Sequence, residues 1–90
     1  MTLALFLRWC CQSGCVVRIE PTDIGGLRRI RIELCMQDSF SGPRKARAGA
    51  EGPQADLDLV VVAALKALRE ELLSASLQQG VDNILREFRP

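Results

Sequence analysis

With 90 residues, 48% of them hydrophobic, and a formal net charge of +1, the chain is long enough for one small domain with a thin core. Its near-neutral charge excludes a global attraction to nucleic acid or to an anionic membrane, so such contacts would need a local patch. The absence of His and Tyr removes the commonest general base and the commonest metal ligand. We therefore expect a protein that is not an enzyme and that holds no metal or cofactor.

The apolar start of the chain ends at Arg8 and lacks both a basic leader and a small-residue cleavage site. It is also too short to cross a bilayer. We expect a cytoplasmic protein without membrane contact, whose four cysteines are reduced.

The first element is predicted over residues 2–11, where large apolar residues alternate with other types. This pattern favours a β-strand with two fairly apolar faces, and a short helix is the alternative. The next three residues, ending in Gly14, fit a tight hairpin loop in which Gly14 takes the left-handed conformation.

Two further strands are predicted at residues 15–20 and 28–36, joined by a turn over residues 21–26 that contains Gly25 and Gly26. One register satisfies apolar and charged pairs together, because each opposite pair on a sheet face contributes about 0.2–1 kcal/mol and a one-residue slip would mix the faces. The predicted pairs are Val17 with Leu34, Ile19 with Ile32, Arg18 with Glu33, and Glu20 with Arg31.

Residues 37–54 are rich in Gly, Ser, Ala, Pro and charged residues. This composition is typical of a flexible linker or loop.

A long helix is predicted from Pro53 to about Leu77, because apolar residues recur along it at helical spacing. The three valines at 60–62 leave a fourth strand over residues 57–62 as an alternative. Gln79 and Gly80 are expected to break the helix before a short final one. The predicted fold is α+β: a β-meander (1–36), a linker (37–54) and a helical part (55–90) of one domain, with the meander packed against the long helix.

This arrangement assigns the side chains of the three predicted strands to two faces. The helix is expected to cover the inner face. Its residues are Leu3, Leu5, Leu7, Trp9, Cys11, Cys15, Val17, Ile19, Ile30, Ile32 and Leu34. The outer face is expected to carry Phe6, Arg8, Cys10, Val16, Arg18, Glu20, Arg29, Arg31, Glu33 and Cys35.

The cysteines do not have the spacing of a structural zinc site, because Cys35 has no close partner and there is no His. The predicted faces place Cys10 and Cys35 too far apart for a disulfide. A Cys11–Cys15 bridge is possible in an oxidising compartment, and buried or incidental free thiols are the simpler interpretation.

Two functional hypotheses remain. The first is a small protein-interaction module of adaptor or regulatory type, self-associating through an apolar helix surface or a sheet edge, since small domains often bury surface in this way. Its candidate contact residues are Leu59, Val60, Val62, Arg29 and Arg31. The alternative is RNA or single-stranded nucleic-acid binding on a basic sheet face with a stacking ring. Its candidate residues are Phe6, Arg8, Arg18, Arg29, Arg31, Arg44, Lys45 and Arg47.

Overall fold

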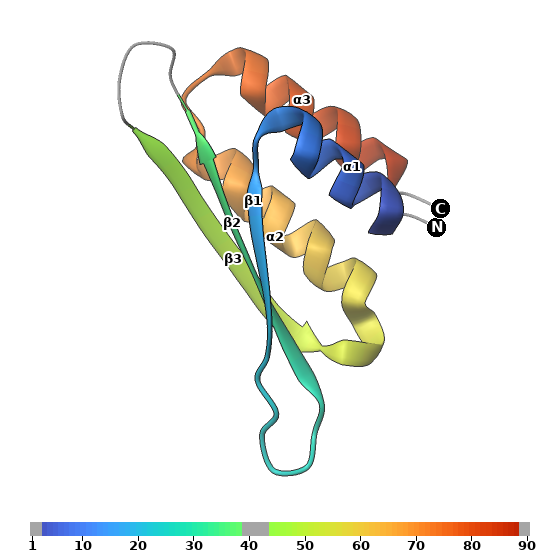
Figure 1. Ribbon diagram of the computed structural model, residues 1–90. Coiled ribbons are helices and arrows are strands. Elements are labelled where there is room, and N and C mark those ends of the chain that lie inside the picture. Colours follow the sequence, from blue (N-terminus) through green and yellow to red (C-terminus); the bar gives the residue numbers. More distant parts are fainter. Residues whose placement is uncertain (1–2, 39–43, 89–90) are drawn as a thin grey trace.

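The computed structural model describes residues 3–38 and 44–88, and these form an α+β arrangement in which an antiparallel sheet is joined to three helices (Figure 1). The strand order β1-β2-β3 is that of a meander. In chain order the elements are α1 (Leu3–Ser13), β1 (Val16–Pro21), β2 (Arg29–Gln37), β3 (Lys45–Pro53), a 3-10 turn η1 (Gln54–Asp56), α2 (Leu57–Glu71) and α3 (Ala75–Glu87). The predicted fold class is confirmed, although the first predicted strand is a helix and β3 lies in the predicted linker.

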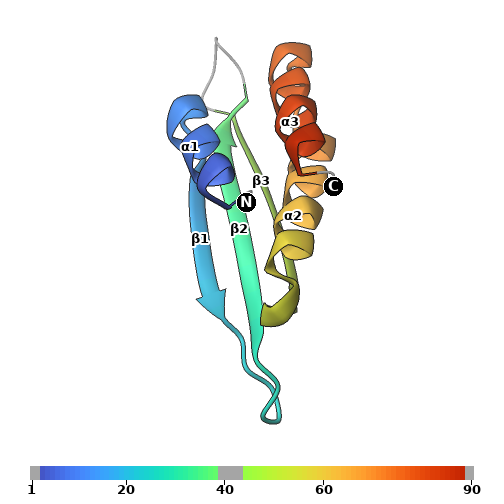
Figure 2. The same cartoon turned by 90° about the vertical axis from the view of Figure 1, so that its right-hand side faces the viewer.

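The three helices lie on one side of the sheet and leave its other side open (Figure 2). Burial along β2 follows this division, because Ile32, Leu34 and Met36 are buried while the residues between them are partly or fully exposed. Alternation with a period of two is what a strand with one covered face requires. We call the covered face the inner face and the other the outer face.

The first element is the helix α1, so the strand predicted over residues 2–11 is wrong and its helical alternative is confirmed for residues 3–11. Phe6 and Cys10, expected on the outer face, are buried, and Cys11, expected inside, is exposed. Phe6 and Cys10 are four residues apart and therefore share one helix face. The Phe6 ring meets Phe88 edge-on, with centroids 6.4 Å apart, which joins α1 to the end of α3.

The predicted register of the next two strands is confirmed in all its pairs, and the antiparallel ladder extends from Val16 opposite Cys35 to Pro21 opposite Ile30. Gly14 before β1 has a φ of 71°, as expected of a left-handed residue. Beyond Pro21 the hairpin continues to a tight turn at Gly25 and Gly26, whose φ values are 57° and 83°. Two successive residues with positive φ form the turn type that suits a twisted hairpin.

The segment predicted as a linker contains β3, so the expectation of a flexible chain is wrong over Lys45–Pro53, while residues 39–43 lie outside the described part. The inward positions of β3 are all small: Ala46, Ala48, Ala50 and Gly52. A Cβ atom added at Gly52 would lie 2.8 Å from Cγ2 of Val60 in α2. The small residues therefore let α2 approach β3 closely.

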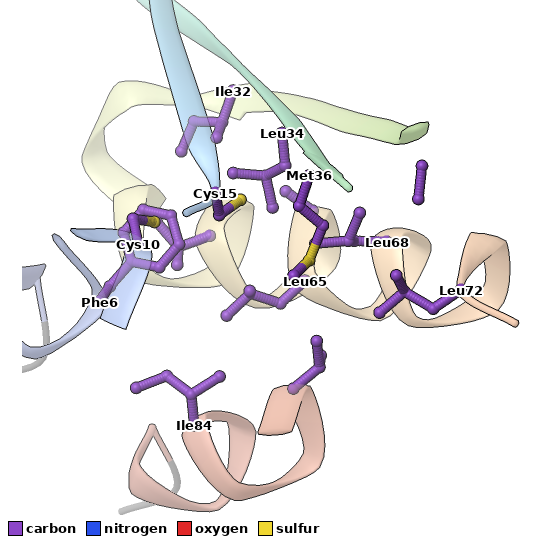
Figure 3. Close-up of a cluster of buried hydrophobic side chains, with 14 of the residues drawn as sticks. Phe6, Cys10, Cys15, Ile32, Leu34, Met36, Leu65, Leu68, Leu72 and Ile84 are labelled. Carbon is purple, nitrogen blue, oxygen red and sulfur yellow. The ribbon is translucent and has the colours of Figure 1, made fainter. Parts of the chain in front are cut away.

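The helical part consists of α2 and α3, which are separated at residues 72–74 and not at Gly80, a residue inside α3. Residues 57–62 are helical, so their alternative assignment as a strand is wrong. Figure 3 shows Leu65 and Leu68 of α2 close to Met36 of β2, with Ile84 of α3 on the opposite side of α2. The apolar surface around α2 is therefore buried between the sheet and α3.

Asp38 fixes the end of β2 to the α2–α3 junction and is almost fully buried. Its carboxylate accepts hydrogen bonds from the amides of Leu73 (3.0 Å to each oxygen) and Ser74 (3.2 Å). Nη1 of Arg44, which immediately precedes β3, donates to Oδ2 at 2.5 Å. Burial favours a higher pKa for Asp38, but these amides and the adjacent guanidinium hold its pKa below the usual value.

Candidate interaction surface

The outer face of the sheet carries positively and negatively charged side chains next to each other. The register places Arg18 opposite Glu33, and Glu20 opposite Arg31, as predicted. The ion pairs that form, however, run along the strands: Arg18 binds Glu20 within β1, and Arg31 binds Glu33 at 3.1 Å within β2. These side chains are substantially exposed, and ion pairs in such positions stabilise weakly.

The outer face has a hollow next to these pairs. It lies at the end of the sheet formed by Val16, Cys35 and Arg47. The hollow has a volume of about 550 Å³ and is open to solvent. Lys45 and Arg47 of β3 line it together with Arg18 and Arg31. It could accept an acidic group, although Glu33 also lines it.

The structure brings together only part of the predicted nucleic-acid set. Phe6 lies in the core and cannot stack on a base, and Arg8 lies on α1, across the sheet from the outer face. Arg44 is bound to Asp38 and to the carbonyl oxygen of Glu71 (3.3 Å). The members of the set that share the outer face are Arg18, Arg29, Arg31, Lys45 and Arg47.

The predicted contact residues of the long helix also differ in their exposure to solvent. Leu59 is 66% exposed, as expected of a contact residue, and Val62 is partly buried. Val60 is only 4% exposed and packs against Gly52 of β3, so it is a core residue and the expectation that a partner covers it is wrong. Arg29 and Arg31 lie on the outer face, away from these helix residues.

The exposed apolar residues of β1 and its hairpin were not among the predicted contact residues. Four large apolar side chains there are exposed: Val16 (67%), Ile19 (44%), Ile24 (62%) and Leu27 (67%). Ile24 and Leu27 flank the tight turn of a hairpin that projects beyond the helices (Figure 1). The signal that could have identified them was the apolar pair directly bordering Gly25-Gly26, where turns are commonly polar.

Among residues 3–38 and 44–88 no strand pairs with the outer edge of β1, so backbone groups of β1 are also free at this side of the molecule. In the hairpin, the amide of Thr22 donates to the carbonyl of Arg29 (3.0 Å), and Ile24 and Leu27 exchange two such bonds (3.1 and 2.9 Å). Bonding alternates along an antiparallel ladder, so the even-numbered residues of β1 face β2. The N–H and C=O groups of Val17 and Ile19, and the C=O of Pro21, therefore point outward from the edge.

Cys10 and Cys15 are both buried, whereas Cys11, the possible disulfide partner of Cys15, is exposed. A hydrogen bond between the two buried thiols raises the pKa of Cys10 and lowers the pKa of Cys15. All four cysteines are free. Within residues 3–38 and 44–88, no cluster of three potential ligands is arranged to hold a metal ion.

No helix in the described part of the chain has both the length and the apolar character needed to cross a membrane. Comparison with known proteins yields no matching family model, no matching curated protein and no matching solved structure.

Proposed function

We propose that this protein is a small, non-enzymatic interaction module that associates with a second copy of itself through the side formed by β1 and its hairpin. The proposal combines apolar side chains with a free strand edge on one side of the domain. The helix surface is the weaker candidate for this contact, because Val60 is buried there.

The observation that carries the proposal is the distribution of exposed large apolar residues. Of the seven in the described chain, four belong to β1 and its hairpin: Val16 on the outer face, Ile19 on the inner face, and Ile24 and Leu27 beside the turn. The other three are Leu7, Leu59 and Leu73. Exposed apolar side chains that gather in one region are typical of interaction sites, whereas scattered single ones need no explanation.

Nucleic-acid binding is less well supported than self-association. The outer face retains Arg29, Lys45 and Arg47 beside its two ion pairs, but Phe6 is not available as a stacking ring. Base stacking and phosphate contacts together provide the affinity of single-strand-binding proteins.

Sedimentation of the full chain over a wide range of concentrations tests self-association. We expect a reversible monomer–dimer equilibrium that is weakened by Ile24→Ser combined with Leu27→Ser. The matched control is Leu59→Ser combined with Leu73→Ser, which removes two equally exposed leucines from the helices and their junction. A wild-type protein that remains monomeric at every concentration would refute the proposal.

A further inference from the structure

We infer that the edges of two β1 strands pair antiparallel about a two-fold axis through Ile19, so that the two sheets form one continuous sheet. This inference rests on the proposed self-association and specifies its contact and its register. In that register Ile19 lies opposite the partner's Ile19, and Arg18 lies opposite the partner's Glu20.

The hydrogen-bonding pattern of β1 restricts the possible registers. Only its odd-numbered residues direct backbone groups outward, so an antiparallel copy must pair odd with odd residues. With Ile19 on the axis, each Ile19 amide donates to the partner's Ile19 carbonyl, and each Val17 amide donates to the partner's Pro21 carbonyl. Pro21 cannot donate in return, which is tolerated in a strand at an edge.

Charge selects among the registers that this pattern allows. With the axis at Ile19, each Arg18 lies opposite the partner's Glu20 on the outer face, where directly opposite charges attract. Moving the axis to position 18 would place Arg18 opposite the partner's Arg18, and moving it to position 20 would oppose two Glu20 carboxylates. Either shift brings like charges together, which destabilises a strand pair.

Apolar contacts favour the same register. Ile19, which is partly exposed on the inner face, acquires an apolar partner on the axis. On the outer face Val16 lies opposite the partner's Thr22 and diagonal to the partner's Ile24, a separation that large side chains can bridge. Exposed residues of both β1 and the hairpin are thereby covered.

The second edge of the sheet, β3, is the competing contact. Its ladder with β2 includes bonds from Asp38 to Arg44 (3.1 Å) and from Gln54 to Arg28 (3.0 Å), so its odd-numbered residues direct backbone groups outward. A two-fold axis at Gly49 would place Arg47 opposite the partner's Glu51. β3 contains no large apolar residue, however, and a Gly at the centre weakens a strand. We therefore assign the contact to β1.

The charge pattern permits a test with two complementary variants, Arg18→Glu and Glu20→Arg. Each variant alone opposes like charges across the axis, and its dimer dissociation constant should rise about tenfold or more, since two pairs change from attraction to repulsion. In a mixture of the two variants, the new carboxylate at position 18 faces the new guanidinium at position 20, and Glu20 of the first variant faces Arg18 of the second. The mixture should therefore form a heterodimer about as stable as the wild-type dimer.

Arg47→Glu is the matched control, because it makes the same charge change at the other edge and should leave the dissociation constant unchanged. The inference is overturned if both β1 variants dimerise like the wild type, if their mixture remains monomeric, or if Arg47→Glu alone dissociates the dimer, which would assign the contact to β3. In the first two cases a dimeric wild-type protein would still uphold the proposed self-association, whereas a contact at β3 would uphold dimerisation but not the β1 side. A monomeric wild type would refute both.

Discussion

Arg18 and Glu20 bind each other along β1, although Arg18 lies directly opposite Glu33 and Glu20 lies directly opposite Arg31. Arg31 and Glu33 form the matching pair along β2. The charges of β1 therefore satisfy each other without using the central strand. Because an exposed ion pair contributes little to stability, Arg18 and Glu20 can exchange partners with a second copy at small cost.

Gly52→Ala should destabilise the fold by about 1–3 kcal/mol, the usual cost of adding a methylene to a packed core. The added methyl group would collide with Val60, which is held in place by α2. In a Val60→Ala background, where space is available, the same change should cost about 0.5 kcal/mol or less. Chemical denaturation of the four proteins measures this coupling.

Gly80→Ala is the matched control for Gly52→Ala. Gly80 lies inside α3, and a Cβ atom there would meet nothing within 4 Å. Because Ala is the better helix former, this change should stabilise the protein by about 0.5–1 kcal/mol. Equal destabilisation by both Gly→Ala changes would contradict the close approach of α2 to β3.

Asp38→Asn should lower the melting temperature at neutral pH, because the neutral amide loses the charge that binds Arg44 and accepts fewer of the surrounding N–H groups. The pKa of Asp38 is lowered in the folded protein from its ordinary value of 3.8. Its stabilising effect is therefore complete above about pH 5 and is lost as the pH falls through the folded-state pKa. The difference in melting temperature between the wild type and Asp38→Asn should therefore become smaller below about pH 4.

The matched control is Asp58→Asn in the exposed first turn of α2, which should leave the melting temperature nearly unchanged at every pH. A constant difference between wild type and Asp38→Asn from pH 3 to pH 7 would show that ionisation of Asp38 does not stabilise the fold.

The four thiols should differ in their rates of alkylation in the native protein. Cys11 is exposed and Cys35 is partly exposed, whereas Cys10 and Cys15 are buried and bind each other. We expect iodoacetamide to modify Cys11 first and to reach Cys10 and Cys15 only when the protein unfolds, as peptide mass spectrometry can follow. Native-state labelling of Cys10 as fast as Cys11 would contradict the helix assigned to α1.

The register of β1 and β2 was predictable because charged and apolar pairs specify it independently. Arg18 with Glu33 and Ile19 with Ile32 require the same alignment, and a slip of one residue violates both. The right pairing did not reveal the ion pairs, because side chains two residues apart on one strand compete with those directly opposite.

The incorrect predictions for α1 and β3 have separate physical causes. In α1 the leucines at 3, 5 and 7 alternate like a strand, while burial follows the helical spacing of Phe6 and Cys10. In β3 the inward residues are too small to give a hydrophobic pattern, since α2 rather than large side chains fills that space. The packing partner of β3 is the next helix, α2, and the composition of residues 45–53 alone does not indicate that contact.

Residue-resolved hydrogen exchange at low and high protein concentration tests the central claim most directly. Within the described fold, the amides of Val17 and Ile19 point outward from β1, whereas the amide of Arg18 is directed at β2. Pairing of two β1 edges predicts that Val17 and Ile19 exchange more slowly as the concentration rises, while the outward amides of Arg47 and Gly49 in β3 do not change. If the protein dimerises and the Ile19 amide exchanges at the same rate in monomer and dimer, the account is contradicted.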